Sequence, residues 1–343
     1  MKILIYSPAF FPSIGGLERI GLILCQEFVH KGHQVKVITT TRSNNFDMPD
    51  NFNFEIIRNP GFIRYIQLLK WCEIYYQRNI SLKGLIAYIF ERKPIVISHH
   101  GVYERRTGKN GFRDRLKLFI VQYTTNISIS NFVAKNLNAN SFVIYNPIDT
   151  DIFNTEYSVK RENKLVFLGR FVSQKGIDIL LRALKIALKV NIDLELVLIG
   201  DGPEKDRLYT LIQELDIKKN ISFRGELKGN ALAEELNKYS IIIVPSLDKE
   251  GFGNVVLEGI ACGCVPIVSN TGGLVEALGE CGLTFNKGDH NDLANKIKIL
   301  LNDDNKFNSF KSHFNKHLEK HKPEIVAKRY LEIFEIALNV WYE

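Results

Sequence analysis

The sequence has no long apolar run and few cysteines. No apolar run approaches the ~20 residues that a helix needs to cross a bilayer, so we expect any contact with a membrane to lie at its surface. The chain opens with a short strand-like run that ends at Pro8 and has no cleavage site. We therefore expect no secretory signal peptide.

The five cysteines are scattered and odd in number, at positions 25, 72, 262, 264 and 281. Cys262 and Cys264 stand too close together for a zinc knuckle, and no second pair accompanies them. This spacing predicts reduced intracellular thiols and no metal site.

Acidic residues are scarce in one stretch only. Residues 58–117 hold 13 basic and 4 acidic residues, whereas residues 156–343 hold 26 and 27. The excess of basic residues that gives the net charge of +7 therefore lies in this stretch. It fits either an anionic partner (lipid, pyrophosphate or nucleic acid) or an ordinary solvated basic surface.

What the chain does have is a repeated alternation of short apolar runs with amphipathic stretches. Such alternation is typical of βαβ units and parallel sheets, and 343 residues suffice for two domains. Strands are expected at Lys2–Ser7, Gln34–Thr39, Phe54–Arg58, Ile74–Gln77, Ile95–Ser98, Asn126–Ser130 and Phe142–Tyr145. A second series is expected at Lys164–Leu168, Leu194–Ile199, Ile221–Phe223, Ile241–Val244 and Val265–Val268.

The predicted fold class is therefore α/β, with two Rossmann-like parallel-sheet domains that face each other across a cleft. The aperiodic segment 146–163 predicts a linker, which gives domains 1–155 and 156–322. Residues 323–343 predict a helix that either crosses back to the first domain or caps its own. Ligands of such sheets bind beyond the carboxyl ends of the strands, so motifs at those ends carry the most weight.

In the first half, two such motifs follow strands. Gly15 and Gly16 precede a helix, where unpaired backbone N–H groups favour a phosphate, although a plain turn explains them equally well. The pair His99 and His100 follows another strand. It either contacts a hydroxylated ligand or transfers a proton, or it is an ordinary satisfied pair.

In the second half, Arg170 and Lys175 lie between a strand and a helix in "GRFVSQKGI". A guanidinium and an ammonium at a helix start suit a pyrophosphate, and the alternative is two exposed basic residues. Phe223, Arg224 and Gly225 offer backbone contacts to a base, a weak signal alone.

The most informative stretch is "DKEGFGNVVLEG" at 248–259. With a helix starting near Gly253, eight residues rise about 12 Å, so Glu250 and Glu258 are unlike a retaining glycosidase pair about 5.5 Å apart. The spacing suits a long ligand with hydroxyls at both ends and an anionic middle that N–H groups of residues 251–254 bind. Two solvated carboxylates are the alternative.

Together these motifs resemble the GT-B glycosyltransferases of glycosyltransferase family 4. The resemblance rests on "PSIGGLERI", "NPIDTDIF", "LVLIGDGPEKDRL", "ISFRGEL" and "VPSLDKEGFGNVVLEGIACGCVPIVSNTGGLVE", and it covers most of the chain. It implies transfer of a hexose from a UDP- or GDP-sugar to a glycan or lipid-linked glycan, with retention at the anomeric carbon. It also implies no cofactor and no essential metal, and no DxD-type manganese site is visible in the sequence.

The resemblance also implies residue roles. Gly15 and Gly16 would approach the diphosphate, and His100, with His99 as the alternative, would contact the transferred sugar. Arg170 and Lys175 would hold the diphosphate and stabilise its departure. Glu250 would bind sugar hydroxyls and Glu258 the ribose diol. The remaining donor-binding residues would be Arg224, Gly251, Phe252, Gly253, Asn254 and Val255.

Relatives with lipid-linked acceptors give the basic stretch a partner. Its basic residues are interleaved with aromatic ones, which suits a peripheral site on anionic lipid at the cytoplasmic face of the membrane. The aromatic residues are Trp71, Tyr75, Tyr76, Tyr88, Phe90, Phe112 and Phe119.

Other functions stay open. They are a soluble transferase acting on small molecules or sugar phosphates, a sugar-nucleotide epimerase, a phosphorylase, a non-catalytic nucleotide-sugar-binding protein and a nucleic-acid binder. No pyridoxal lysine site can be located for a phosphorylase. No helix-turn-helix, zinc finger or RNP pattern supports nucleic-acid binding, so we expect none.

Overall fold

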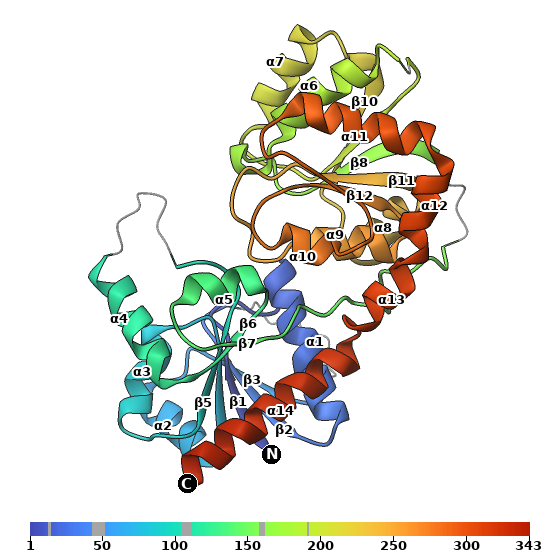
Figure 1. Cartoon of the computed structure of the whole chain (residues 1–343). Helices are drawn as coiled ribbons and strands as arrows, with labels where there is room; N and C mark the ends of the chain where they lie inside the picture. The colour runs from blue at the N-terminus through green and yellow to red at the C-terminus, as the bar shows by residue number, and fades with distance from the viewer. Residues whose placement is uncertain (13–14, 43–51, 104–110, 158–161, 191) are drawn as a thin grey trace. The chain divides into compact units, whose positions relative to one another are not determined.

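The computed structural model describes residues 1–12, 15–42, 52–103, 111–157, 162–190 and 192–343. The chain forms two compact units (Figure 1). The first comprises Met1–Pro147 together with His321–Glu343, and the second comprises Ile148–Lys320. The first of these two segments, Met1–Pro147, ends within the stretch predicted as a linker, 146–163.

The first unit is built on a sheet of seven strands in the order β3-β2-β1-β4-β5-β6-β7. Every pairing in it is parallel. The strands are β1 (Lys2–Tyr6), β2 (Gln34–Thr39), β3 (Glu55–Arg58), β4 (Ile74–Arg78), β5 (Ile95–His99), β6 (Thr125–Ser128) and β7 (Phe142–Val143). All seven predicted strands are present, with ends shifted by a few residues.

Alternation along β1 shows why both faces of this sheet are covered. Ile3 and Ile5 join one buried cluster, whereas Leu4 and Tyr6 join another on the opposite face. Successive strand residues point to opposite faces, so an all-apolar strand requires a helical layer on each side. Helices α1 (Gly16–His30) and α14 (Pro323–Tyr342) cover the first face (Figure 1). The other face carries α2 (Phe62–Trp71), α3 (Leu82–Ile86), α4 (Phe112–Ile120) and α5 (Asn131–Leu137).

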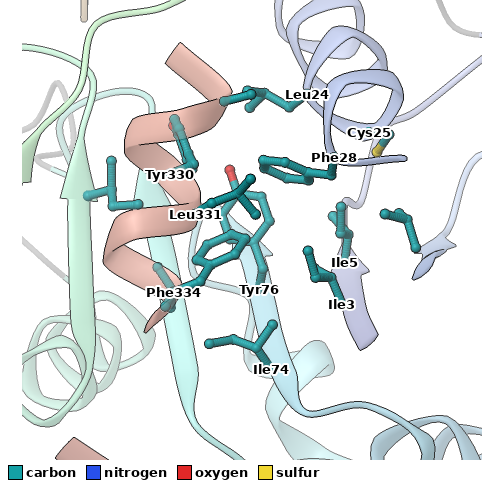
Figure 2. Close-up of a cluster of buried hydrophobic side chains, with 14 of the residues drawn as sticks. Ile3, Ile5, Leu24, Cys25, Phe28, Ile74, Tyr76, Tyr330, Leu331 and Phe334 are labelled. Carbon is teal, nitrogen blue, oxygen red and sulfur yellow. The ribbon is translucent and has the colours of Figure 1, made fainter. Parts of the chain in front are cut away.

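Helix α14 is part of the first unit because its apolar stripe completes that core. Figure 2 shows Tyr330 and Phe334 of α14 beside Phe28 of α1 and Tyr76 of β4. The rings of Phe28 and Phe334 lie 5.5 Å apart, and those of Tyr76 and Phe334 lie 5.3 Å apart. Burying one such side chain contributes about 1.5–3 kcal/mol.

Two aromatic residues expected on the basic surface lie in the core instead. Tyr75 and Tyr76 are fully buried, one on each face of β4. The expectation was wrong for them because β4 is a central strand of the sheet, so neither of its faces meets solvent.

The second unit holds six parallel strands in the order β10-β9-β8-β11-β12-β13. They are β8 (Glu162–Leu168), β9 (Leu196–Ile199), β10 (Ile221–Gly225), β11 (Tyr239–Val244), β12 (Val265–Ser269) and β13 (Leu283–Phe285). The sequence reasoning missed β13 because three residues carry too little pattern.

Helices cover both faces of the second sheet. They are α6 (Ile177–Ala187), α7 (Lys205–Glu214), α8 (Gly229–Asn237), α9 (Asn254–Ala261), α10 (Leu274–Leu278), α11 (His290–Asn302), α12 (Asp304–Ser312) and α13 (Phe314–Glu319). Figure 1 shows α6, α7 and α11 on one face and α8, α9 and α10 on the other. Within the described residues, no helix of either unit has both the length and the hydropathy needed to span a membrane.

Candidate functional site

The strand order of each sheet locates its ligand-binding edge. In the second unit the order reverses between β8 and β11, and in the first unit it reverses between β1 and β4. Loops leaving two such strands diverge to opposite faces and open a crevice at the carboxyl ends. A ligand site is therefore expected at each of these two switch points.

At the switch point of the second unit, Lys175 and Glu250 form an ion pair. Lys175 ends a short 3-10 turn after β8, and its Nζ lies 2.7 Å from Glu250 Oε1 in the loop after β11. Ser246 donates its hydroxyl to the same carboxylate oxygen. Ser269, at the end of β12, donates to the Ser246 carbonyl at 2.6 Å. Three neighbouring strands thus build one polar cluster.

Glycines allow these loops to approach closely. Gly176 has φ +65°, and a Cβ there would lie 3.1 Å from the Pro245 carbonyl carbon and closer still to its oxygen. Leu247 N–H donates to the Gln174 carbonyl at 2.7 Å, which ties the loop after β8 to the loop after β11.

A second glycine turn supports Glu250 from the side of β12. Gly273 N–H donates to the Glu250 carbonyl at 2.8 Å. Gly272 has φ +57°, and a Cβ there would lie 2.8 Å from the Glu250 nitrogen and overlap its carbonyl oxygen. The turn at 271–273 therefore fixes the backbone of Glu250.

The predicted helix start lies directly after this loop. Gly253 takes φ +110° as the N-cap of α9 and has no side chain with which to cap the helix. Phe252 is 2% exposed and packs into the core, whereas Gly251, Asn254 and Val255 are half-buried. Glu258 lies in the second turn of α9 and is also half-buried. Glu250 and Glu258 are therefore separated by a glycine turn and a helix start, as expected.

Arg170 and Arg224 differ in their surroundings. Arg170 is exposed at the end of β8. Arg224 on β10 pairs with Glu235 of α8, with its Nε 3.0 Å from Glu235 Oε1. That pairing leaves the backbone of residues 223–225 as the part predicted to contact a base.

At the switch point of the first unit, a pocket of about 120 Å³ opens among the ends of β1, β4 and β5 and the start of α1. It is lined by Ser7, Pro8, Ala9, Leu17, Glu18, Arg78, Asn79 and His100. Gly15 is the N-cap of α1 and Gly16 its first residue, both exposed. The predicted glycines and histidine thus belong to the same edge of the sheet.

The two histidines have different environments. Both ring nitrogens of His99 are engaged, at 2.7 Å from the Tyr103 hydroxyl and 2.9 Å from Asn126 Oδ1, and burial lowers the pKa of His99 to about 4. His100 lines the pocket, and its Nε2 lies 2.8 Å from the Ser98 hydroxyl. Burial, and next the nearby Arg78 charge, hold the pKa of His100 well below its usual range.

Sequence reasoning missed Ser246, Asn79 and Arg78. Asn79 takes the left-handed conformation at φ +60° and accepts the His100 N–H at 2.9 Å. Its only signal in the sequence was its place after an apolar strand, directly behind the arginine. In the described parts of the chain, no three His, Cys, Asp or Glu side chains gather in a way that could hold a metal ion.

Comparison with known families identifies the chain. The model described as Glycosyl transferases group 1 matches residues 149–317, and the model described as Glycosyltransferase Family 4 matches residues 14–152. The chain belongs to the GT-B glycosyltransferases. The Lys175–Glu250 pair of this glycosyltransferase lies within the first match, and the pocket of His100 lies within the second apart from Ser7, Pro8 and Ala9.

Relatives of this glycosyltransferase have several activities in their names. An uncharacterized glycosyltransferase of Methanocaldococcus jannaschii is 34% identical over 238 residues, which are 65% of this chain and 63% of the relative. N-acetyl-alpha-D-glucosaminyl L-malate synthase of Bacillus anthracis is 25% identical, with 86% of each chain covered.

Solved structures share the fold of this glycosyltransferase. HepE of Anabaena, solved with UDP, superposes with a TM-score of 0.83 at 18% identity, covering 98% of this chain and 100% of that one. A glycosyltransferase of Rickettsia africae superposes at 0.82 with 19% identity, covering 98% of each chain. These likenesses establish the architecture.

Proposed function

We propose that this protein is a retaining, metal-independent glycosyltransferase. It transfers a hexose from a UDP- or GDP-sugar to a hydroxyl of a glycan or lipid-linked glycan, in the synthesis of cell-surface polysaccharide or glycolipid. The observation that carries the proposal is the Lys175–Glu250–Ser246 cluster at the switch point of the second sheet, in a chain of the GT-B glycosyltransferases.

The cluster supplies charges that fit a nucleotide-sugar. Lys175 and the exposed Arg170 bind the diphosphate, and its negative charge draws Lys175 away from Glu250. Glu250 is then free to accept hydrogen bonds from sugar hydroxyls. The backbone N–H groups at the start of α9 bind phosphate or sugar, and Glu258 binds the ribose diol.

Catalysis follows from charge development on the leaving diphosphate. As the bond from the anomeric carbon to the phosphate oxygen breaks, negative charge collects on that oxygen, where Arg170 and Lys175 stabilise it. The acceptor hydroxyl attacks the face that the diphosphate leaves, and a diphosphate oxygen takes its proton. His100 is neutral at pH 7 because burial lowers its pKa, and it contacts the transferred sugar as a hydrogen-bonding group.

A donor screen tests the proposal. Release of nucleoside diphosphate is measured with UDP- and GDP-sugars, with and without a lipid-diphosphate sugar acceptor. We expect acceptor-dependent release with one donor class. Tight donor binding without release in the presence of any acceptor would instead identify a non-catalytic binding protein.

A second candidate is transfer to a small anionic acceptor. It is supported by the Bacillus anthracis relative, which is named for L-malate and aligns over 86% of this chain. Including L-malate and a sugar phosphate in the donor screen separates the candidates, because each predicts turnover with only one class of acceptor.

For a lipid-linked acceptor, we propose that the protein sits on the cytoplasmic face of the membrane through anionic lipid. Support comes from exposed aromatic side chains beside basic residues. Phe90 is 68% exposed, Phe112 82% and Phe119 55%. Such side chains insert at the headgroup level while neighbouring lysines and arginines meet the lipid charge.

Vesicle co-sedimentation at low and high salt tests this site. Phe112→Ser should weaken binding to anionic vesicles. High salt should weaken the binding of the wild type and of the variant. The matched control is Val190→Ser in the second unit, which removes an apolar side chain that is 64% exposed. No binding of the wild type at low salt would refute the membrane proposal.

A further inference from the structure

One charged residue is buried in the first unit without an opposite charge. Arg78, the last residue of β4, is 4% exposed. Its Nη1 donates to the Ser7 hydroxyl at 3.1 Å, and its Nη2 donates to the Leu17 carbonyl. In the part of the chain that the structure describes, no carboxylate lies within ion-pair distance of this guanidinium.

Accommodating this cation destabilises the folded protein in two ways. Burying an unpaired charge costs several kcal/mol. Gly21 in the middle of α1 adds roughly 0.5–1 kcal/mol relative to alanine. A Cβ on Gly21 would overlap Arg78 Nη1 and lie 2.6 Å from Cζ. Helix α1 therefore has a glycine where the guanidinium packs, and substitution there would displace it.

The same guanidinium lines the pocket at the switch point, together with His100. Among the residues that the structure describes, two buried polar atoms at this place have no hydrogen-bond partner, Arg78 Nε and His100 Nδ1. Buried polar atoms are almost always paired, so two orphans beside one cavity point to a ligand that supplies the partners. The left-handed backbone of Asn79 in the same wall is the kind of conformation found at binding sites.

We propose that this pocket binds an anionic oxygen group, a phosphate or a carboxylate, of one of the two substrates of sugar transfer. Arg78 provides the charge and the Nε–H donor, and His100 Nδ1 remains the hydrogen-bonding atom for the transferred sugar. The inference rests on the proposed function, since the group belongs to a substrate. It has two possible sources: the donor's diphosphate, or an anionic group of the acceptor.

The pocket selects for small groups. Its volume of about 120 Å³ admits a group of a few heavy atoms and excludes a whole nucleotide. Glu18 also lines it, so the wall of the pocket carries a negative as well as a positive side chain.

Titrations of the full-length protein with UDP, inorganic phosphate and L-malate test the site. Arg78→Gln removes the charge, and Gly21→Ala displaces the guanidinium without removing it. We expect both variants to bind one of these probes about 10- to 100-fold more weakly, as the loss of a charge-assisted hydrogen bond implies. Matched controls are Arg92→Gln, at an exposed arginine, and Gly61→Ala, where a Cβ meets nothing within 4 Å.

The pattern of loss identifies the source. Weaker UDP binding with unchanged malate binding assigns the pocket to the donor's diphosphate, whether or not phosphate binding also weakens. Weaker phosphate or malate binding with unchanged UDP binding assigns it to the acceptor. Wild-type affinity for all three probes in both variants would overturn the inference.

A measurement on the unaltered protein guards against variants that fail to fold. Wild-type crystals soaked in tungstate, a heavy oxyanion, should show its anomalous signal within hydrogen-bond distance of Arg78 Nε. A vacant pocket at saturating tungstate would overturn the inference. Neither binding measurement needs turnover. Anion binding without sugar transfer would refute only the proposed function, and transfer with Arg78-independent binding would refute only this inference.

Discussion

Each unit places a cation at its switch point, but the two cations are held in opposite ways. Lys175 of the second unit stands on a loop, half-buried, with its charge neutralised by Glu250 at 2.7 Å. Arg78 of the first unit stands at the end of a central strand, buried, and donates to a hydroxyl and a carbonyl. The first arrangement is an ion pair that a ligand can exchange; the second is a fixed charge.

The two cations differ in how easily they can leave their present partners for a ligand. A partly exposed ion pair is worth about 0–1 kcal/mol, so a diphosphate can take Lys175 from Glu250 at little cost. Arg78 has no such freedom, because Ser7, Leu17 and Gly21 hold it on three sides. We infer that the second unit adapts to its ligand, whereas the first is preorganised.

The largest effect should come from removing the exchangeable cation. Lys175→Ala should lower kcat about 10²- to 10³-fold, because charge on the leaving diphosphate loses its partner. Arg170→Ala should act in the same direction. Thermal unfolding should barely change, since the lost pair is weak.

The control for this prediction is Lys164→Ala. Lys164 pairs with Glu195 at 2.9 Å near the start of β8. It lies toward the amino end of the strand, away from the carboxyl ends where the site is, so its loss should leave kcat unchanged. Near-normal turnover of Lys175→Ala would show that the diphosphate assignment is wrong.

The two glutamates should separate binding from transfer. Glu258→Gln should mainly raise the donor KM, because it weakens contacts to the ribose made equally in ground and transition states. Glu250→Gln should mainly lower kcat. Either effect should be about tenfold, the worth of one charged hydrogen bond. Steady-state kinetics with varied donor measures both, and the reverse pattern would exchange the two roles.

The backbone support of Glu250 should be sensitive to one methyl group. Gly272→Ala should destabilise the second unit by about 1–3 kcal/mol more than Gly229→Ala. The two glycines have nearly the same φ, +57° and +56°, but only Gly272 faces the Glu250 backbone. Urea unfolding measures the difference, and equal destabilisation would show that close packing of the loop adds nothing.

The most gradual effect is an acid destabilisation of both units. Burial lowers the pKa of His99 in the first unit and of His317 in the second to about 4. Unfolded histidine binds a proton near pH 6.5, so stability is complete above that pH and falls between 6.5 and about 4. Each histidine should contribute about 1.4 kcal/mol per pH unit.

Melting temperatures between pH 7.5 and 5 measure this loss. His317→Gln can still donate to the Ala277 carbonyl and should flatten the loss, whereas His30→Gln, at an exposed position, should not. An unchanged pH profile in His317→Gln would contradict the prediction.

Much of the architecture could be predicted from the sequence. Apolar runs such as those of β1 and β2 predicted the strands of a parallel sheet, and glycines after strand ends marked the loops of the site. Failures came where pattern was short or ambiguous: β13 has three residues, and Tyr75 and Tyr76 look like part of a basic–aromatic surface until the sheet buries them.

The sequence by itself determined the strand and helix series, the glycine turns and the spacing of Glu250 and Glu258, because these depend on local periodicity and backbone conformation. Only the tertiary structure decided which charges meet. Lys175 and Glu250 are 75 positions apart, and Arg78 and Ser7 are 71 apart. Strand order brings such residues together, and strand order depends on the packing of the whole sheet rather than on any one segment.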